Sequence, residues 1–355
     1  MDIKIILKEL VEKNASDVFI VAGRPLSYKQ DGVIRTYAEE VLMPQTTREL
    51  IQQIYESANN RSTEQLVKYG DDDFSFAVKN VSRFRVSAYK QRGSLAAVIR
   101  VITFSLPDPE ALNIPENVLK QVDRDKGLVL VTGVSGSGKS TTVACMIDRI
   151  NSRRSSHIVT LEDPIEYLHP HKQSIVSQRE ISLDTQTYLI GLRAVLRQTP
   201  NVIFIGELRD AETISIAMTA AETGHLVIST LHTAGAANTV DRIIDAFPAE
   251  KQEQIRLQLS MVLSAVVSQQ FVTTLDRKIY PAFEIMVCNS AVRNMIREAK
   301  THQLDSTILS ASSEGMMTMD NALMQLYQAG RIDAQMAIGK SFNPELMEKR
   351  LEMKK

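Results

Sequence analysis

The chain has few cysteines and no tryptophan, and its charges almost cancel. Only Cys145 and Cys288 occur among 355 residues, outside any C-x-x-C or Cys/His spacing. This argues against a zinc site or a disulfide framework, and we interpret both cysteines as core thiols. The formal net charge of −1 gives no general attraction to nucleic acid or to anionic lipid.

Long apolar runs are also absent. No segment offers a charge-free apolar stretch long enough to cross a bilayer. The first eight residues interleave charged and apolar side chains, and they lack the apolar run and small-residue cleavage site of a signal peptide. We therefore expect a cytoplasmic protein that meets a membrane only through partners.

The length favours two domains. Residues 1–104 open with an amphipathic pattern at helical spacing over residues 3–13 and continue with strand-like runs, which predicts a small α+β domain. The further elements expected here are strands at 17–21, 84–89 and 96–101 and a helix near 47–57. Residues 105–116 contain three prolines, which oppose regular structure, and we place an interdomain linker there.

Residues 117–355 predict an α/β domain. Short apolar runs, the first at residues 127–131, alternate with helical stretches, which is typical of a parallel sheet covered by helices. From about Asp276 onward the pattern turns mostly helical and rich in methionine. We interpret these methionines as core residues and assign them no function.

A glycine-rich segment satisfies G-x-x-x-x-G-K-[S/T] between a strand run, residues 128–131, and a helix, residues 141–151. Its glycines let successive backbone N–H groups and the helix N-terminus point at phosphates. Lys139 adds a positive charge, and Ser140 adds a hydroxyl ligand for Mg²⁺. The pattern predicts an ATP site formed by Gly133, Val134, Ser135, Gly136, Ser137, Gly138, Lys139, Ser140 and Thr141.

Three further apolar runs each end in polar residues. Glu162, Asp163 and Glu166 follow the first, Glu207 the second, and His232 the third. Because ligands of open α/β sheets bind outside the carboxyl ends of the strands, we expect these groups to converge on the phosphate loop. Such carboxylates supply what phosphoryl transfer to water requires, so the sequence predicts an ATPase.

Glu207 directly follows a strand and a glycine, so we predict that it joins Ser140 around Mg²⁺. Glu166 is the candidate for the base that activates or aligns water, with Glu162 and Asp163 as alternatives. His225 and His232 are candidates for sensing the γ-phosphate, and a structural hydrogen-bonding role is the alternative.

Together these residues resemble the secretion ATPases of type IV pili and type II secretion, and most closely the pilus-retraction ATPases of twitching motility. The resemblance covers nearly the whole chain. It implies a PAS-like N-terminal domain followed by a RecA-like ATPase domain with a helical C-terminal region, assembled as a homohexamer with nucleotide between subunits. Besides the phosphate loop it rests on residues 14–17, 83–86, 162–166, 206–210, 219–225 and 230–233.

The resemblance also implies residue roles. Glu166 falls on the family's acidic box and Glu207 on its atypical Walker B position, while His225 and His232 fall on its histidine box. Ring assembly further implies arginine fingers, which neutralise charge in the transition state.

The first domain offers two arginines in strand-like stretches as the candidate fingers, Arg85 and Arg100. Arg83, Arg92 and Arg209 are the alternatives. The choice rests on the resemblance, because an arginine considered alone is more often solvated than catalytic.

Residues 290–298 resemble the family's A-I-R-N-L-I-R-E motif, which is associated with retraction, with two conservative departures. Without the resemblance, this segment predicts an amphipathic core helix capped by Ser290. Extension ATPases usually carry an additional N-terminal domain and a tetracysteine zinc motif, which this two-cysteine chain does not supply.

The resemblance therefore implies ATP-driven pilus retraction at the cytoplasmic face of the inner membrane. The implied partners are a membrane platform protein and a related pilus ATPase. An accessory retraction ATPase, an extension ATPase and a type II secretion ATPase stay open as alternatives within the family. Outside it, the alternatives are a nucleotide-gated scaffold and a nucleic-acid motor, although the neutral charge and missing tryptophan weigh against nucleic acid.

Overall fold

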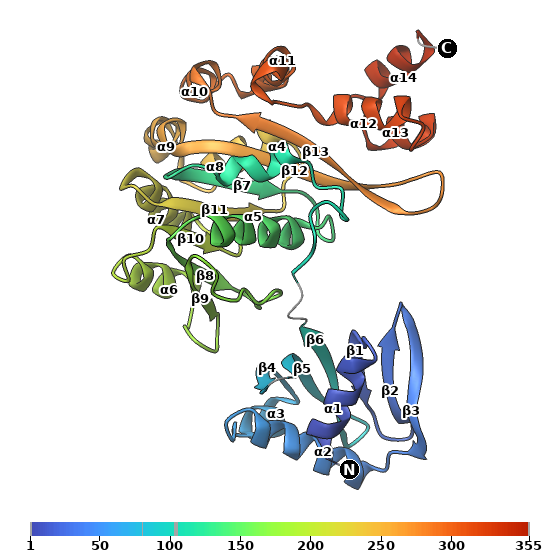
Figure 1. Cartoon of the computed structure of the whole chain (residues 1–355). Helices are drawn as coiled ribbons and strands as arrows, with labels where there is room; N and C mark the ends of the chain where they lie inside the picture. Colours follow the sequence, from blue (N-terminus) through green and yellow to red (C-terminus); the bar gives the residue numbers. More distant parts are fainter. Residues whose placement is uncertain (1, 80, 103–105, 354–355) are drawn as a thin grey trace. The chain divides into compact units, whose positions relative to one another are not determined.

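The computed structural model describes residues 2–79, 81–102 and 106–353 (Figure 1). The chain divides into two units. The first comprises Met1–Ser105 with Glu166–Leu168, and the second comprises Leu106–Ile165 with His169–Lys355. Ser105, the first residue of the expected linker, lies outside the described residues. Each unit has its own sheet and its own hydrophobic core.

The first unit is an α+β domain, as predicted. Its six strands form an antiparallel sheet in the order β3-β2-β1-β6-β5-β4. The helix α1 buries Ile3, Ile6, Leu7 and Leu10 against this sheet's core. The elements are α1 (Ile3–Glu12), β1 (Asp17–Ile20), β2 (Pro25–Gln30), β3 (Val33–Val41), α2 (Pro44–Ser57), α3 (Glu64–Tyr69), β4 (Asp71–Val78), β5 (Ser82–Gln91) and β6 (Ser94–Ile102).

Sequence reasoning found α1, β1, α2, β5 and β6 but not the other strands of this sheet. The reason is clearest for β3, an edge strand on which no residue is fully buried, so that its sequence carries no alternating apolar signal. The strand β4 begins with three aspartates, a residue depleted in strands.

The second unit is built on a seven-stranded sheet in the order β13-β12-β7-β11-β10-β8-β9. All neighbouring strands are parallel except β12 and β13, which form an antiparallel hairpin. The strands are β7 (Gly127–Thr132), β8 (His157–Glu162), β9 (Ile175–Glu180), β10 (Val202–Ile205), β11 (Leu226–Leu231), β12 (Leu263–Thr273) and β13 (Ile279–Val287).

Helices cover both faces of this sheet (Figure 1). In β7, Leu128 and Leu130 belong to one apolar cluster while Val129 and Val131 belong to another, because successive residues of a strand face opposite sides. The helices and short 3₁₀ turns are α4 (Glu116–Leu119), η1 (Lys120–Val122), α5 (Lys139–Arg153), α6 (Tyr188–Val195), α7 (Ala211–Glu222), α8 (Ala236–Asp245), α9 (Ala249–Val262), α10 (Ser290–Arg297), η2 (Thr301–Gln303), α11 (Leu304–Ser310), η3 (Ser312–Glu314), α12 (Met319–Gln328), α13 (Ala334–Lys340) and α14 (Pro344–Glu352).

The last three helices, α12 to α14, form what we call the C-terminal helices. They enclose a small apolar cluster of their own with Val272 and Ala282 from the β12–β13 hairpin. Met319 and Met324 are buried in that cluster, which confirms the interpretation of these methionines as core residues. Cys145 and Cys288 are likewise buried thiols.

From Asp276 onward the described chain is mostly helical, as expected, apart from the strand β13, which pairs along its whole length with β12. The expected cap of α10 was wrong. The cap of α10 is Asn289, whose side chain accepts a hydrogen bond from the Val292 amide, and not Ser290. Within the described ranges no helix is long and apolar enough to cross a membrane.

Candidate active site

The phosphate loop connects β7 to α5 at the carboxyl edge of the seven-stranded sheet. Gly133, Gly136 and Gly138 have φ angles of 144°, 76° and 87°, a region that side chains disfavour. The helix α5 begins at Lys139, and no side chain caps it. The phosphate loop therefore ends at a helix N-terminus, where the helix dipole favours an anion such as a phosphate.

The end of strand β12 packs directly on this loop. The Thr142 hydroxyl of α5 donates a hydrogen bond of 2.7 Å to the Gln269 side chain. A Cβ atom added to Gly133 would lie 2.2 Å from the Gln269 carbonyl oxygen, and one added to Gly138 would lie 2.7 Å from the Phe271 ring. Sequence reasoning missed Gln269 and Phe271, whose only signal is a pair of glutamines late in an apolar run.

Ser137 carries a polar atom that needs a partner. Its hydroxyl oxygen is buried and has no hydrogen-bond partner among the described residues. Buried polar groups are nearly always hydrogen-bonded, so an unpaired hydroxyl inside a phosphate loop fits a ligand with acceptor oxygens. This atom is a structural indication for nucleotide that is independent of the motif.

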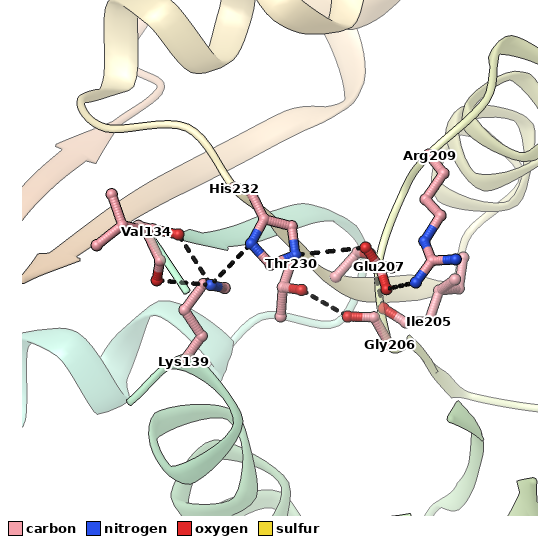
Figure 2. A network of polar contacts seen from close by, with 10 residues as sticks. Val134, Lys139, Ile205, Gly206, Glu207, Arg209, Thr230 and His232 are labelled. Atoms are coloured by element: carbon pink, nitrogen blue, oxygen red, sulfur yellow. Dashed lines mark hydrogen bonds and ion pairs between the residues drawn. The ribbon is translucent and has the colours of Figure 1, made fainter. Parts of the chain in front are cut away.

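Lys139 is only 8% exposed, and backbone carbonyls hold its ammonium group. The Nζ atom donates to the carbonyls of Gly133 and Val134, at 2.8 and 3.1 Å. It also lies 3.4 Å from Nδ1 of His232, as Figure 2 shows. An ammonium group has only donors, so Nδ1 of His232 acts as the acceptor in this contact.

His232 links the phosphate loop to the acidic residue after β10. With Nδ1 facing Lys139, the ring proton of neutral His232 sits on Nε2, which lies 3.4 Å from Oε2 of Glu207 (Figure 2). The predicted convergence of these two strand ends on the phosphate loop is thus observed. Thr230 fixes the same edge, because its hydroxyl donates to the Gly206 carbonyl at 2.6 Å.

Glu207 is held as a charged carboxylate. Arg209 donates to its Oε1 atom at 2.5 Å. This hydrogen bond is the main reason why the pKa of Glu207 is lowered; the charge of Arg209 and the contact with His232 add to it, while burial opposes it. Arg209 is an alternative arginine finger in the sequence analysis. In the structure its contact with Glu207 brings it to the candidate site.

The three acidic residues at and after the end of β8 lie in different environments. Glu162 is buried and accepts hydrogen bonds from Thr160 and Gln178, at 2.5 and 3.0 Å. Asp163 and Glu166 are exposed in the irregular segment that follows. Since Glu162 already accepts two hydrogen bonds inside the sheet, the exposed residues are better placed to contact water, and Glu166 stays the predicted base.

His225 lies at the opposite end of β11 from His232. Its Nδ1 atom donates to the Ala220 carbonyl at 2.9 Å, in the last turn of α7. It lines a cavity of about 520 Å³ with residues such as Arg154 and Asn201. Within this chain the two predicted histidines therefore do not share a site.

The predicted arginine fingers belong to the first unit. Arg85 and Arg100 are directly opposite each other on β5 and β6, and Arg100 pairs with Asp17 at 3.1 Å. The alternatives Arg83 and Arg92 lie on β5 and in the turn after it. The roles of these arginines stay predictions.

The helix α10 that carries the retraction-like motif is an integral part of the fold. Val292 and Ile296 are buried in the core. The Arg293 guanidinium donates to the carbonyls of Ser260 and Met261, both at 2.6 Å, at the end of α9. Arginine at this position stabilises the unpaired carbonyls of a helix end, so the motif has a structural reason in this chain.

Comparisons with known proteins identify the family of this chain. Residues 1–329 match the family described as type II/IV secretion system protein. The chain is 41% identical to the type IV pilus retraction ATPase PilT of Pseudomonas aeruginosa, over 97% of this chain and 99% of that protein. It is 39% identical to the type IV pilus ATPase PilU of the same organism, over 94% and 86%.

A solved structure of the pilus retraction motor PilT with bound ADP has a TM-score of 0.89 to this chain. The identity is 43%, and the match covers 98% of this chain and 99% of that one. The resemblance seen in the motifs is thus confirmed for the family, the fold and the nucleotide-binding class. The chain belongs to the type II/IV secretion system protein family and is a homologue of the pilus retraction ATPases.

Proposed function

We propose that this chain is a motor ATPase that couples ATP hydrolysis to the retraction of type IV pili, and thereby to twitching motility. The observation that carries the proposal is the Lys139–His232–Glu207 contact chain at the carboxyl edge of the sheet. These contacts join the phosphate loop to a carboxylate, and the protein matches a retraction ATPase over 97% of its length.

Residues 133–141 hold the phosphates in this proposal. Phosphate oxygens replace the carbonyl acceptors of Lys139 and supply the missing partner of Ser137. Since His232 contacts both Lys139 and Glu207, a movement of the lysine towards phosphate is transmitted to Glu207. This gives His232 the role of a sensor for the occupied loop.

The residues also fit a magnesium ion. The Ser140 hydroxyl at the start of α5 and the charged carboxylate of Glu207 are hard oxygen ligands, which Mg²⁺ prefers. When bound, the ion neutralises part of the phosphate charge. Glu166 aligns the attacking water in this proposal, as its place in the family's acidic box implies.

We further propose a homohexamer in which Arg85 and Arg100 complete the site of a neighbouring subunit. Their direct pairing across two antiparallel strands places both guanidinium groups on one face of the sheet. Two such charges suit the developing negative charge of phosphoryl transfer, for which arginine fingers contribute roughly 10³ to 10⁵ in rate. In this proposal the ring acts at the cytoplasmic face of the inner membrane on a pilus platform protein, and not on nucleic acid.

Phosphate release by the purified, hexamer-sized protein with Mg²⁺ and ATP tests the catalytic part. We expect activity in the native chain and its loss in Lys139→Ala and Glu166→Gln, with ADP binding retained in the Glu166 variant. A native chain that binds ADP but releases no phosphate would point to a nucleotide-gated scaffold and contradict the ATPase.

Twitching of a strain without its own pilus ATPases, complemented with this chain, tests retraction. Restored twitching with the native chain but not with Lys139→Ala supports a retraction motor. The similarity to PilU favours an accessory motor as the second candidate, which would restore twitching only beside a second retraction ATPase. Restored pilus assembly without retraction would contradict both.

A further inference from the structure

The segment after His232 is anchored to the β12–β13 hairpin. The amide of Gly235 donates to the Ser268 hydroxyl at 2.9 Å, and the amide of Ala236 donates to Oε1 of Glu284 at 2.7 Å. Only three residues separate His232 from Ala236, a span of roughly 10 to 14 Å when fully extended. The position of the His232 ring therefore depends on where the start of α8 is held.

Glu284 connects this anchor to the C-terminal helices. It is only 1% exposed, and its second oxygen accepts a hydrogen bond of 3.2 Å from the amide of Met319. Ala236 and Met319 are the first residues of α8 and α12. One buried carboxylate thus binds the N-termini of two helices, where the helix dipoles favour a negative charge.

The charge state of Glu284 depends on these contacts. Burial raises its pKa to about 7, and the neighbouring carboxylates Asp305 and Asp320 add to the rise. The two amide donors, from Ala236 and Met319, oppose it because they stabilise the charged form. The hydrogen bonds therefore strengthen as the pH rises through this range and Glu284 becomes charged.

Phe342 makes a second connection between the same two regions. Gly235 has a φ of 87°, and a Cβ atom added there would lie 3.1 Å from the Phe342 ring, so the ring packs on the bare backbone of this residue. Phe342 is positioned in turn by Asp320 of α12, which accepts hydrogen bonds from the amides of Phe342 and Asn343 at 2.7 and 3.2 Å.

We propose that Glu284 and Phe342 are positioning residues for ATP hydrolysis. They fix the C-terminal helices to the start of α8 and thereby hold His232 between Lys139 and Glu207. The inference rests on the proposed ATPase function. Its consequence is that displacement of the C-terminal helices lowers turnover without removing any group that contacts nucleotide.

The test compares Glu284→Gln and Phe342→Ala with two controls from the same helices. Glutamine keeps the shape of the side chain but offers one acceptor oxygen for the two amides. Leu346→Ala removes a half-exposed apolar side chain that lines the same cavity as Phe342. Asp333→Ala removes the cap of α13, which accepts from the Met336 amide, and leaves both connections intact.

Turnover and ADP affinity are measured at pH 8 on the full chain. We expect kcat to fall about tenfold in Glu284→Gln and Phe342→Ala, while the Kd for ADP changes less than about threefold, and both controls to stay within about twofold of the native values. The double variant should lose less than the product of the two single effects, because the residues hold the same segment.

Hydrogen–deuterium exchange of residues 232–238 gives a readout that needs no turnover. We expect faster exchange in both variants than in the controls. Phe342 is 44% exposed, so we expect Phe342→Ala to fold. This variant can therefore be measured even if Glu284→Gln does not fold. Native-like kcat and native-like exchange in folded Phe342→Ala would overturn the inference. A native chain that binds ADP without turnover would overturn the proposed function, and exchange would still decide the positioning role.

Discussion

The two ends of strand β11 each carry a histidine, but their rings are held by different kinds of group. At the carboxyl end, His232 lies between two charged side chains, Lys139 and Glu207. At the amino end, His225 donates to a backbone carbonyl, that of Ala220 in the last turn of α7. The first ring contacts the groups expected at the phosphates, whereas the second contacts the end of a helix.

This difference shows that two histidines of one motif can have different roles. A six-residue strand separates the positions by roughly 20 Å, so one subunit cannot bring both rings to one phosphate group. The two edges of the sheet therefore predict different consequences when each histidine is replaced. Turnover should depend on the carboxyl edge, and stability on the amino edge.

The largest effect is expected at the carboxyl edge. His232→Ala breaks the contact chain between Lys139 and Glu207, and we expect kcat to fall about a hundredfold, as when a preorganised hydrogen-bonding group is removed from a catalytic site. Steady-state phosphate release measures kcat, and the Kd for ADP serves as the binding control. A kcat within threefold of native would remove His232 from the proposed mechanism.

A smaller and different effect is expected at the amino edge. His225→Ala removes one hydrogen bond to the Ala220 carbonyl, which also accepts from the Thr223 hydroxyl, so we expect a loss of about 0.5 to 1 kcal/mol in the free energy of unfolding. We expect kcat to stay within about twofold of native. Denaturant unfolding and phosphate release measure the two quantities. A loss of turnover as large as that of His232→Ala would break the contrast between the edges.

The smallest effect concerns the pH dependence of the carboxyl edge. Arg209 is the main cause of the lowered pKa of Glu207. A carboxylate with a lowered pKa stays charged as the pH falls, until its folded-state pKa is reached. Arg209→Met should raise that pKa towards its ordinary value, so that activity is lost at a higher pH on the acid side.

The acid limb of kcat/KM against pH measures this shift, which we expect to be towards higher pH. Arg193→Met is the matched control, because Arg193 is about as exposed as Arg209 and pairs with Glu212, a carboxylate that does not contact Glu207. An acid limb that moves equally in both variants, or in neither, would contradict the assigned role of Arg209.

The sequence predicted those parts of the fold that repeat a regular pattern. The buried strands of the second unit read as apolar runs, and helices such as α1 show their apolar face at helical spacing. The strand β3 was not predicted from the sequence, and β13 lies within a segment expected to be mostly helical. The alternation of apolar side chains is absent from the exposed edge strand β3, and β13 is defined by its partner β12.

The candidate site, like the fold, was predictable only in part. The phosphate loop and Glu207 follow from motif and strand order, because the carboxyl ends of parallel strands meet at one edge. Gln269 and Phe271 were not predictable, since they reach the loop through a strand that is more than a hundred residues away in the sequence. The cap at Asn289 was missed by one residue, because capping depends on backbone geometry that neighbouring polar residues can equally supply.

By itself, the sequence determined that this protein binds a phosphate-bearing ligand on an α/β scaffold and which family its motifs resemble. Local signals suffice for that: glycines that tolerate positive φ, a lysine at a helix start, and carboxylates after strands. Only the tertiary structure decided which histidine meets Lys139, which arginine holds Glu207, and that one buried carboxylate, Glu284, joins the starts of α8 and α12. Those contacts join residues distant in sequence, and their energy depends on distance and burial that no local pattern encodes.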